Sequence, residues 1–374
     1  MTETKTPSTR RPTRIGPAAP VGLATRIGFA TRIGFVLAAL VALSAGAAAQ
    51  SLPNPYVLVD DWPHLPSHMN GGKWGETIGV DRDADGNIWV FHRCFNNQPP
   101  GAATCVGRDD DPPVVKFSPE GGLLDSWGEG VFAAPHGFHI DPEGNIWATD
   151  YNGRETVLGM PTGGRGHQVF KFSPSGEILM TLGKAGVAGN GPDTFDRPSD
   201  VAVNADGDIF VTDGHGPNNR VVKFDRNGRF LLTWGGPGDG PGEFDQPHTL
   251  TLDSRGRVFV GDRSNSRVQI FEPDGTFVAE WKQFGRPSGM FIDEDDVLYV
   301  TDSTSNSRNN PDIKRGIYIG SAVDGTVHAY IPDPDLEHAE ERGISGASGI
   351  TADRQGNVYA ADVGPQRIRK YVKR

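Results

Sequence analysis

The chain has 374 residues, of which 50 are Gly and 29 are Pro, and so many helix-breaking residues exclude a coiled coil or a helical bundle. A hydrophobic content of 36% and an aromatic content of 9% exclude a disordered chain and favour short strands joined by Gly- and Pro-rich turns. The formal net charge of −11 at pH 7 argues against a nucleic acid or an anionic lipid as partner.

The first 49 residues differ in composition from the rest of the chain. They hold six basic residues and one acidic residue, followed by an apolar run from Ile33 to about Gly46 and then by Ala47-Ala48-Ala49. A charged region, a short apolar region and small residues before the cleavage point are typical of a secretory signal peptide. We therefore predict a signal peptide over residues 1–49, cut near Ala49, and one domain over residues 50–374.

Export implies a periplasmic or secreted protein, and the Arg10-Arg11 pair leaves the twin-arginine and the general secretory routes both open. Cleavage leaves 30 Lys and Arg residues against 46 Asp and Glu residues, so the mature chain is strongly acidic. No later segment approaches the roughly 20 apolar residues of a membrane helix. We therefore expect no membrane insertion, and we expect a monomer.

Cys94 and Cys105 are the only cysteines in the sequence. In an oxidising compartment two such cysteines are expected to form a disulfide, here closing a loop of about a dozen residues. The alternative is a pair of free thiols, because sequence separation alone does not guarantee the geometry of a disulfide.

A short unit recurs six times, and this repetition predicts the fold. Its pattern is an apolar residue, Asp, two variable residues, Gly and Asn, then a strand that ends in Thr-Asp, as in IDPEGNIWATD. The six copies span residues 80–92, 140–150, 203–213, 252–262, 292–302 and 352–362. Five copies are followed by a second hairpin, beginning at Val114, Val169, Val221, Val268 and Gly316. Six four-stranded antiparallel sheets predict an all-β, six-bladed β-propeller whose blades resemble NHL repeats.

The last unit shows how the ring is expected to close. Its third strand, RIRKY over residues 367–371, is followed by only three residues, so the unit has no fourth strand of its own. The segment YVLVDDW over residues 56–62 has the pattern of the fourth strands LLDSW and FVAEW. We therefore predict that this N-terminal strand completes the last blade and leaves no open edge.

The innermost strands of a propeller converge on an axial channel, so one equivalent position in each blade forms a ring around the axis. Counting back four residues from the apolar residue before the repeat's Asp gives Glu76, His136, Ser199, His248, Ser288 and Ser348. Two imidazoles and a carboxylate are a donor set for zinc or another divalent transition metal. We therefore predict a metal site of His136, His248 and Glu76. The alternative for each histidine is a buried side chain hydrogen-bonded to the backbone.

A second ring follows the Thr-Asp element. Its members are Arg93, Tyr151, Gly214, Arg263, Ser303 and Val363, and His215 comes one residue after Gly214. Arg93 and Arg263 come from opposite blades, and a guanidinium presents a planar fork that suits a carboxylate. This ring predicts a clamp for a carboxylate-bearing substrate. The alternative is that each arginine pairs with an aspartate at a blade corner.

These stretches together resemble peptidyl-α-hydroxyglycine α-amidating lyase. The resemblance is carried by FAAPHGFHIDPEGNIWATD, IFVTDGHG, GEFDQPHTLTLDSRGRVFVGD and IWVFHR, whose order and spacing correspond along the whole propeller. It implies a zinc-dependent propeller that cleaves a hydroxyglycine-extended peptide to a peptide amide and glyoxylate. It also implies that His136 and His248 match two of the three zinc-binding histidines, and that Arg93 and Arg263 match the two functional arginines.

Three positions depart from the pattern of that family. Ser348 stands where the family has its third zinc-binding histidine, and Gly349 stands where the family has an acidic residue that helps to hold a structural calcium. His215 stands where the family has its catalytic tyrosine. Glu76 could complete the metal site, and either His215 or Tyr151 could act as the base.

Our leading hypothesis is an exported, metal-dependent lyase that cleaves the C–N bond of a peptidyl-α-hydroxyglycine-like substrate. Two alternatives stay open: metal-assisted hydrolysis of a lactone or ester at the same axial site, and a non-catalytic module that binds a peptide or glycan. Calcium could bind the Asp-rich turns at residues 81–85, 109–111 and 293–296, which otherwise are solvated turn residues.

Overall fold

The computed structural model describes residues 52–94, 104–157, 159–335 and 346–374. The predicted signal peptide lies outside the described residues, so export and its route remain predictions. Within the described part of the chain, no helix is long and apolar enough to cross a membrane.

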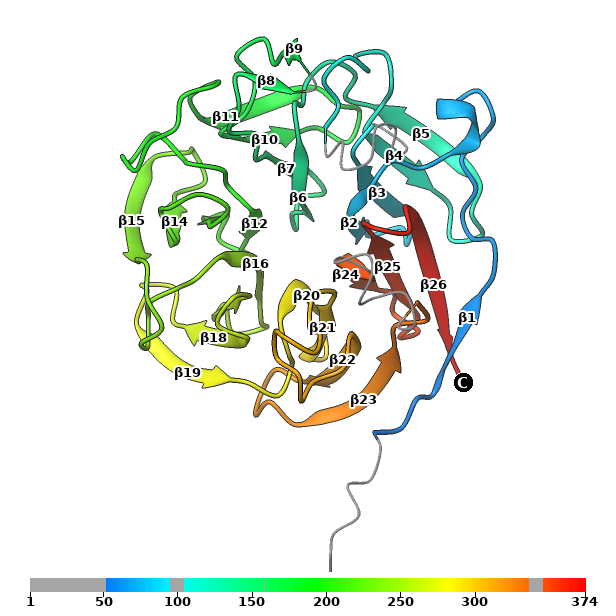
Figure 1. Ribbon diagram of the computed structural model, residues 1–374, viewed down its shortest axis with the longest axis vertical. Helices are drawn as coiled ribbons and strands as arrows, with labels where there is room; N and C mark the ends of the chain where they lie inside the picture. The colour runs from blue at the N-terminus through cyan, green and yellow to red at the C-terminus, as the bar shows by residue number, and fades with distance from the viewer. Residues whose placement is uncertain (1–51, 95–103, 158, 336–345) are drawn as a thin grey trace, which may run out of the picture. The chain divides into compact units, whose positions relative to one another are not determined.

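Six four-stranded antiparallel sheets form the blades of a propeller, which confirms the predicted fold (Figure 1). Blade 1 contains β2 (Thr77–Arg82), β3 (Ile88–His92), β4 (Val114–Phe117) and β5 (Leu123–Trp127). Blade 2 contains β6 (Pro135–Ile140), β7 (Ile146–Asp150), β10 (Gln168–Phe172) and β11 (Ile178–Gly183). Blade 3 contains β12 (Asp200–Val203), β13 (Ile209–Asp213), β14 (Arg220–Phe224) and β15 (Phe230–Gly235).

The remaining blades repeat this order. Blade 4 contains β16 (Pro247–Leu252), β17 (Val258–Asp262), β18 (Arg267–Phe271) and β19 (Phe277–Trp281). Blade 5 contains β20 (Pro287–Ile292), β21 (Val297–Asp302), β22 (Gly316–Ser321) and β23 (Val327–Pro332). Blade 6 contains β24 (Ala347–Ala352), β25 (Val358–Asp362), β26 (Arg367–Lys373) and β1 (Tyr56–Val59). A small hairpin of β8 (Thr156–Val157) and β9 (Met160–Pro161) extends from blade 2, and a short 3-10 turn, η1 (Asn70–Gly72), precedes blade 1.

The N-terminal strand closes the ring as predicted. Strand β1 pairs with β26 from Tyr56 opposite Lys373 to Val59 opposite Lys370, and the two strands lie side by side in Figure 1. The strand ends three residues before the predicted end at Trp62. The chain turns at this point, where Asp61 adopts a left-handed φ of 59°.

The repeated Asp-x-x-Gly-Asn sequence forms the turn between the first two strands of a blade. In blade 2 the Asp141 carboxylate accepts hydrogen bonds from the backbone N–H groups of Glu143 and Asn145 and from the Trp147 indole, and Gly144 adopts a φ of 85°. A side chain that caps its own turn explains why this Asp recurs in the sequence.

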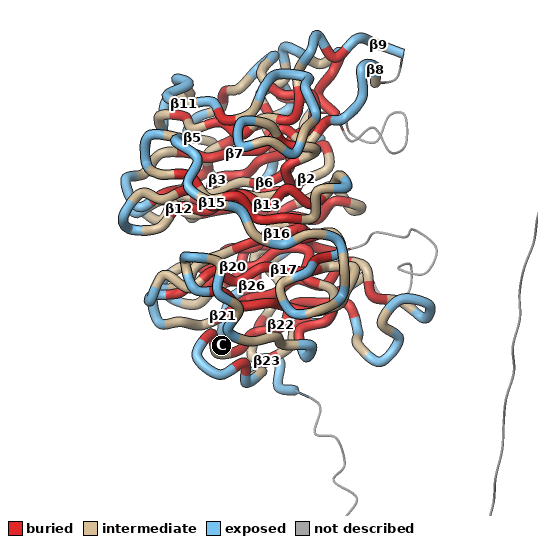
Figure 2. Tube along the Cα trace, turned by 90° about the vertical axis from the view of Figure 1, so that its left-hand side faces the viewer, coloured by how far each residue is buried: buried red, intermediate tan, exposed pale blue. Residues whose placement is uncertain are grey.

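Burial differs between the second and the outer strands of a blade. The second strand of a blade is buried along its whole length in blades 1, 2, 3, 4 and 6, whereas the outer strands β11 and β15 are largely exposed (Figure 2). The hydrophobic clusters lie between neighbouring blades and seal them together; one joins Trp147 of blade 2 to Val211 of blade 3. The innermost strands of successive blades contact one another all around the ring.

Candidate metal centre

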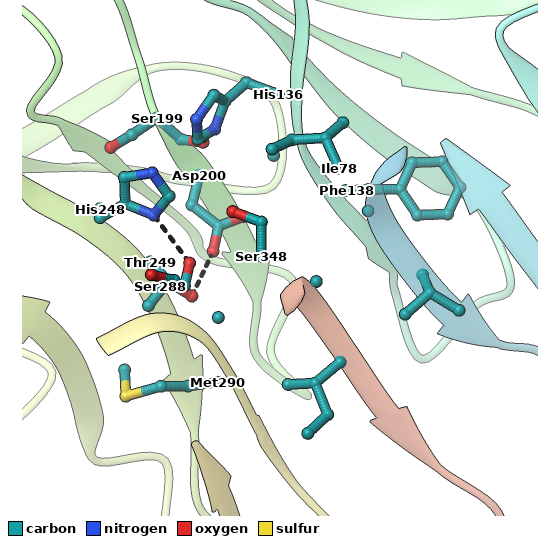
Figure 3. A pocket seen from close by; sticks show the side chains of 16 residues that line it. Ile78, His136, Phe138, Ser199, Asp200, His248, Thr249, Ser288, Met290 and Ser348 are labelled. Carbon is teal, nitrogen blue, oxygen red and sulfur yellow. Dashed lines mark hydrogen bonds between the residues drawn. The ribbon is translucent and has the colours of Figure 1, made fainter. Parts of the chain in front are cut away.

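In five of the six blades a bulge in the innermost strand turns one side chain toward the axis. The strand register skips from Pro135 to Phe138 in blade 2 and from Pro247 to Thr249 in blade 4, with an equivalent skip in blades 1, 5 and 6. Bulges re-aim side chains and are frequent beside functional sites. His136 and His248 sit at these positions, and Figure 3 shows them beside each other at one end of an axial cavity.

The cavity is lined by one ring residue from each blade. These residues are Ile78, His136, Ser199, His248, Ser288 and Ser348. Five of the six match the predicted ring, and the blade 1 position was predicted wrongly.

The correct ring residue of blade 1 is Ile78, two residues after Glu76. The turn of blade 1 is capped by Asp83, whose carboxylate accepts hydrogen bonds from Asn87 and Trp89, and not by Asp81. Counting back four residues from Arg82, which precedes Asp83, therefore gives Ile78 and not Glu76. The Glu76 carboxylate instead lies 2.6 Å from the Arg93 guanidinium.

A third histidine joins His136 and His248. His215 follows β13, and its Nε2 atom lies 2.8 Å from Nε2 of His136. One ring nitrogen from each of His136, His215 and His248 falls within 4.8 Å of the others. Among the described residues, no other group of His, Cys, Asp or Glu is gathered closely enough to suggest a metal.

Local backbone geometry brings His215 to the axis. Gly214 lies so close to blade 4 that a Cβ atom there would meet the Pro247 carbonyl oxygen at 2.0 Å, so any larger residue would push the loop away. The His215 backbone N–H donates to the Arg197 carbonyl, which fixes the loop on its other side. The sequence placed His215 one residue after the second ring, but it did not predict that the His215 side chain faces the axis.

The backbone sets the tautomer of two of the histidines. His136 Nδ1 lies 2.6 Å from the Ser199 carbonyl oxygen, and His248 Nδ1 lies 2.7 Å from that of Ser288. A carbonyl only accepts, so each Nδ1 carries the proton, and each neutral ring keeps its Nε2 lone pair. This is the usual second-shell arrangement around metal-binding histidines.

The three imidazoles are held neutral. Burial lowers the pKa of His136 well below its usual range, and the nearby charge of Arg93 lowers it further. Burial also lowers the pKa of His215 and of His248, with Arg263 and the neighbouring histidines acting in the same direction. Neutral rings with convergent Nε2 atoms fit a divalent transition metal that prefers nitrogen ligands.

Arg93 and Tyr151 lie beside this cluster. The Arg93 guanidinium is 5.0 Å from the centre of the Tyr151 ring, and that ring is 5.0 Å from each of the His136 and His215 rings. Burial alone would lower the pKa of Arg93, but attraction to Tyr151 and Glu76 outweighs it and raises the pKa.

Arg263 lies on the other side and is an incompletely paired cation. Its Nε atom donates to the Gln246 side chain at 3.3 Å, and no carboxylate of the described residues forms an ion pair with it. Burial, together with repulsion from Arg286 and Arg93, lowers its pKa to about 9. A guanidinium in this state favours an anion beside it. Arg263 therefore does not pair with a blade-corner aspartate.

The predicted disulfide between Cys94 and Cys105 is present. It follows Arg93 directly, and the Cys105 backbone N–H donates to the Ala133 carbonyl, three residues before His136. Two of the three Asp-rich turns that could bind calcium have other partners: Asp109 and Asp111 each pair with an arginine, and the Asp83 carboxylate accepts from its own turn and pairs with Lys116.

Comparison with known proteins agrees with the fold. The NHL repeat family matches residues 195–224 and 244–271. Peptidyl-alpha-hydroxyglycine alpha-amidating lyase 1 of Drosophila melanogaster is 30% identical over 86% of this chain and 61% of its own length. The chain thus spans less than two thirds of that lyase.

Two further relatives place the chain more broadly. A gluconolactonase from Xanthomonas campestris has a similar structure, with a TM-score of 0.52, 15% identity and coverage of 87% of this chain and 99% of that one, which shows a shared fold. NHL repeat-containing protein 3 of Mus musculus is 32% identical over 83% of this chain and 82% of its own length. The chain is therefore a member of the NHL-repeat propeller family that includes this protein, and a homologue of the amidating lyases.

Proposed function

We propose that His136, His215 and His248 hold one divalent transition metal, for which zinc is the best candidate. The main support for this proposal is that one ring nitrogen from each of these three neutral imidazoles lies within 4.8 Å of the others on the propeller axis. With both Nδ1 protons committed to carbonyls, His136 and His248 present lone pairs toward the point that His215 also faces. Glu76 is not part of this proposed ligand set, because its carboxylate is engaged by Arg93.

We also propose that the protein is an exported lyase acting on N-acyl-α-hydroxyglycines, as its homology to the Drosophila amidating lyase suggests. Arg263 would bind the substrate carboxylate, because it is a half-buried cation without an acidic partner among the described residues. Arg93 would face the same carboxylate from the opposite blade while Glu76 holds it in place. A bound zinc ion would act as a Lewis acid and lower the pKa of the substrate hydroxyl.

Tyr151 takes the role of the base in this proposal. The His215 Nε2 atom faces His136 and is committed to the ligand set, whereas the Tyr151 ring borders His136, His215 and Arg93. The Tyr151 oxygen would accept the hydroxyl proton and pass it to the amide nitrogen. The electron pair of the O–H bond would form the new carbonyl as the C–N bond breaks, giving a free amide and glyoxylate.

The arrangement of the axial site favours this proposal over a non-catalytic binding module. In such a module nothing requires the axial histidines to converge, and they could point apart or pair with aspartates. His136 and His248 instead converge, with their ring centres 4.8 Å apart, and His215 joins them.

The direct test is glyoxylate release from an acetyl-peptidyl-α-hydroxyglycine by the zinc-loaded protein. The expected result is stoichiometric glyoxylate and peptide amide, abolished by His136→Ala together with His248→Ala. A protein that holds zinc but releases no glyoxylate from any such peptide would contradict the lyase proposal and leave the metal site standing.

A further inference from the structure

A pocket of about 190 Å³ opens beside the histidine cluster, between blades 2 and 3. It is lined by Ala134, Tyr151, Asn152, Gly153, Arg154, Val157 and Arg197. Tyr151 belongs both to this pocket and to the cluster, since its ring lies 5.0 Å from that of His215. A molecule held at the cluster would therefore extend into the pocket without leaving the protein surface.

Ala134 is a small residue at a position where blades 1, 3 and 4 carry longer side chains. The backbone carbonyl of Ala134 accepts a hydrogen bond from the N–H of Tyr151. The equivalent carbonyls belong to Glu76, Arg197 and Gln246, which accept from Arg93, His215 and Arg263. The methyl group of Ala134 lines one side of the pocket, and Arg197, the equivalent residue of blade 3, lines another.

Two arginines give the pocket its chemistry. Arg197 lies flat against the backbone of Gly153, where a Cβ atom would sit 2.8 Å from the Arg197 Cδ. Its Nε atom is 3.2 Å from the Asp196 carboxylate, and its terminal nitrogens make no hydrogen bond or ion pair with the described residues. Arg154 is exposed at the rim, and its guanidinium has no acidic partner in the described part of the chain.

We propose that this pocket binds the acyl part of the substrate and is specific for an acyl group that carries a carboxylate. This inference rests on the proposed function, and it makes the preferred substrate a dianion. One carboxylate, on the hydroxyglycine, lies at Arg263, and the second, on the preceding residue, lies between Arg197 and Arg154. Charge-assisted hydrogen bonds from guanidinium to carboxylate are the strong kind, and two cations would favour an acid over its amide isostere.

The test compares acetyl-Glu-α-hydroxyglycine with acetyl-Gln-α-hydroxyglycine, which differ only in the charge at the acyl side chain. The zinc-loaded protein is expected to show a kcat/KM for the Glu substrate about tenfold higher than for the Gln substrate. Arg197→Gln and Arg154→Gln should each reduce this ratio toward one. Arg229→Gln is the matched control, because Arg229 is 78% exposed on the outer part of blade 3, and this variant should leave the ratio unchanged.

A binding measurement separates this inference from the lyase proposal. The product amides acetyl-Glu-NH₂ and acetyl-Gln-NH₂ can be titrated calorimetrically into the same proteins, and this readout needs no turnover. Tighter binding of the Glu amide that is lost in the Arg197 and Arg154 variants supports the pocket even if no glyoxylate is released. Equal binding of the two amides by the unaltered protein overturns it, even if both substrates are cleaved.

Discussion

The imidazoles of His136 and His215 face each other across two blades, with their Nε2 atoms 2.8 Å apart. In the ion-free protein one of these atoms must carry a proton, and it is that of His215, because His136 keeps its proton on Nδ1. A metal would replace that proton and leave both nitrogens as ligands. The amidating lyase pattern has its third histidine in blade 6, where this chain has Ser348. In the proposed site the third ligand comes from blade 3 instead.

Replacing Tyr151 by Phe tests the assignment of the base. The Tyr151→Phe variant should lose about 10²- to 10⁴-fold in kcat, because general-base catalysis contributes an effect of that size. Its metal content should match that of the unaltered protein, since the phenol is not in the proposed ligand set. An unchanged kcat in steady-state glyoxylate assays would assign the base to another group.

Arg263 is predicted to lower the free energy of unfolding while it strengthens binding of the substrate carboxylate. The Arg263→Met variant should unfold at higher denaturant concentration, by about 1 kcal/mol, because it removes a half-buried cation that has no acidic partner. The same change should raise KM for hydroxyglycine substrates at least tenfold. Arg229→Met, on the exposed outer part of blade 3, is the control and should change neither quantity. A destabilised Arg263→Met protein would mean that this cation is better paired than its contacts indicate.

The disulfide is predicted to support both the fold and Arg93. The Cys94→Ser, Cys105→Ser double variant should lose about 3 kcal/mol in the free energy of unfolding, because cross-linking a loop of this length restricts the unfolded chain. Its KM should rise, because Arg93 precedes Cys94 and would gain freedom, while its metal content should persist. Denaturant titration and elemental analysis measure these effects, and unaltered stability would contradict the first of them.

The neutral histidines predict a pH dependence of stability. In the unfolded chain each of them binds a proton near pH 6.5, but in the folded protein each does so only at much lower pH. Below pH 6.5 the unfolded state therefore holds more protons, and the free energy of unfolding falls as pH falls, by up to about 1.4 kcal/mol per pH unit for each histidine. Above that pH the contribution is constant.

Asp200 changes the free energy of unfolding with pH in the opposite direction, so the measurement needs a reference protein that also contains Asp200. Burial raises its pKa to about 7, so the folded state holds a proton that the unfolded chain loses at lower pH. Comparing the metal-free protein with a variant in which His136, His215 and His248 are all Asn removes this term, because both proteins contain Asp200. The unaltered protein should lose stability relative to the variant between pH 7 and pH 5. A difference that stays constant would show that the histidines are not held neutral.

The fold could be predicted from the sequence because one short sequence pattern repeats in every blade. Six copies of one turn and strand pattern define six blades, and the missing strand of the last copy defines the closure by β1. The position of His136 and His248 on the axis followed from the same period. Blade 1 was misaligned because VDRDADGN offers two candidate aspartates, Asp81 and Asp83. The spacing Asp-x-x-Gly-Asn fits Asp83, and the turn hydrogen bonds of Asp83 agree with it.

The remaining site features depend on contacts between blades. His215 reaches the cluster because Gly214 passes against Pro247 of blade 4, and the pairing of Glu76 with Arg93 is set by the loops that precede and follow the inner strands. The pocket is lined by residues of two blades, with Ala134 and Tyr151 from blade 2 and Arg197 from the loop before blade 3. Sequence period defines which residues share a ring, but it does not define where a side chain outside the strands points.

The metal content of the purified protein tests the central claim most directly. Elemental analysis should find about one zinc or other divalent transition ion per chain, and His215→Ala should lose it as fully as His136→Ala does. His328→Ala is the control, because His328 is exposed on β23, and this variant should keep the metal. A His215→Ala protein that binds metal as tightly as the unaltered chain, or a chain that binds none after reconstitution, would contradict the account.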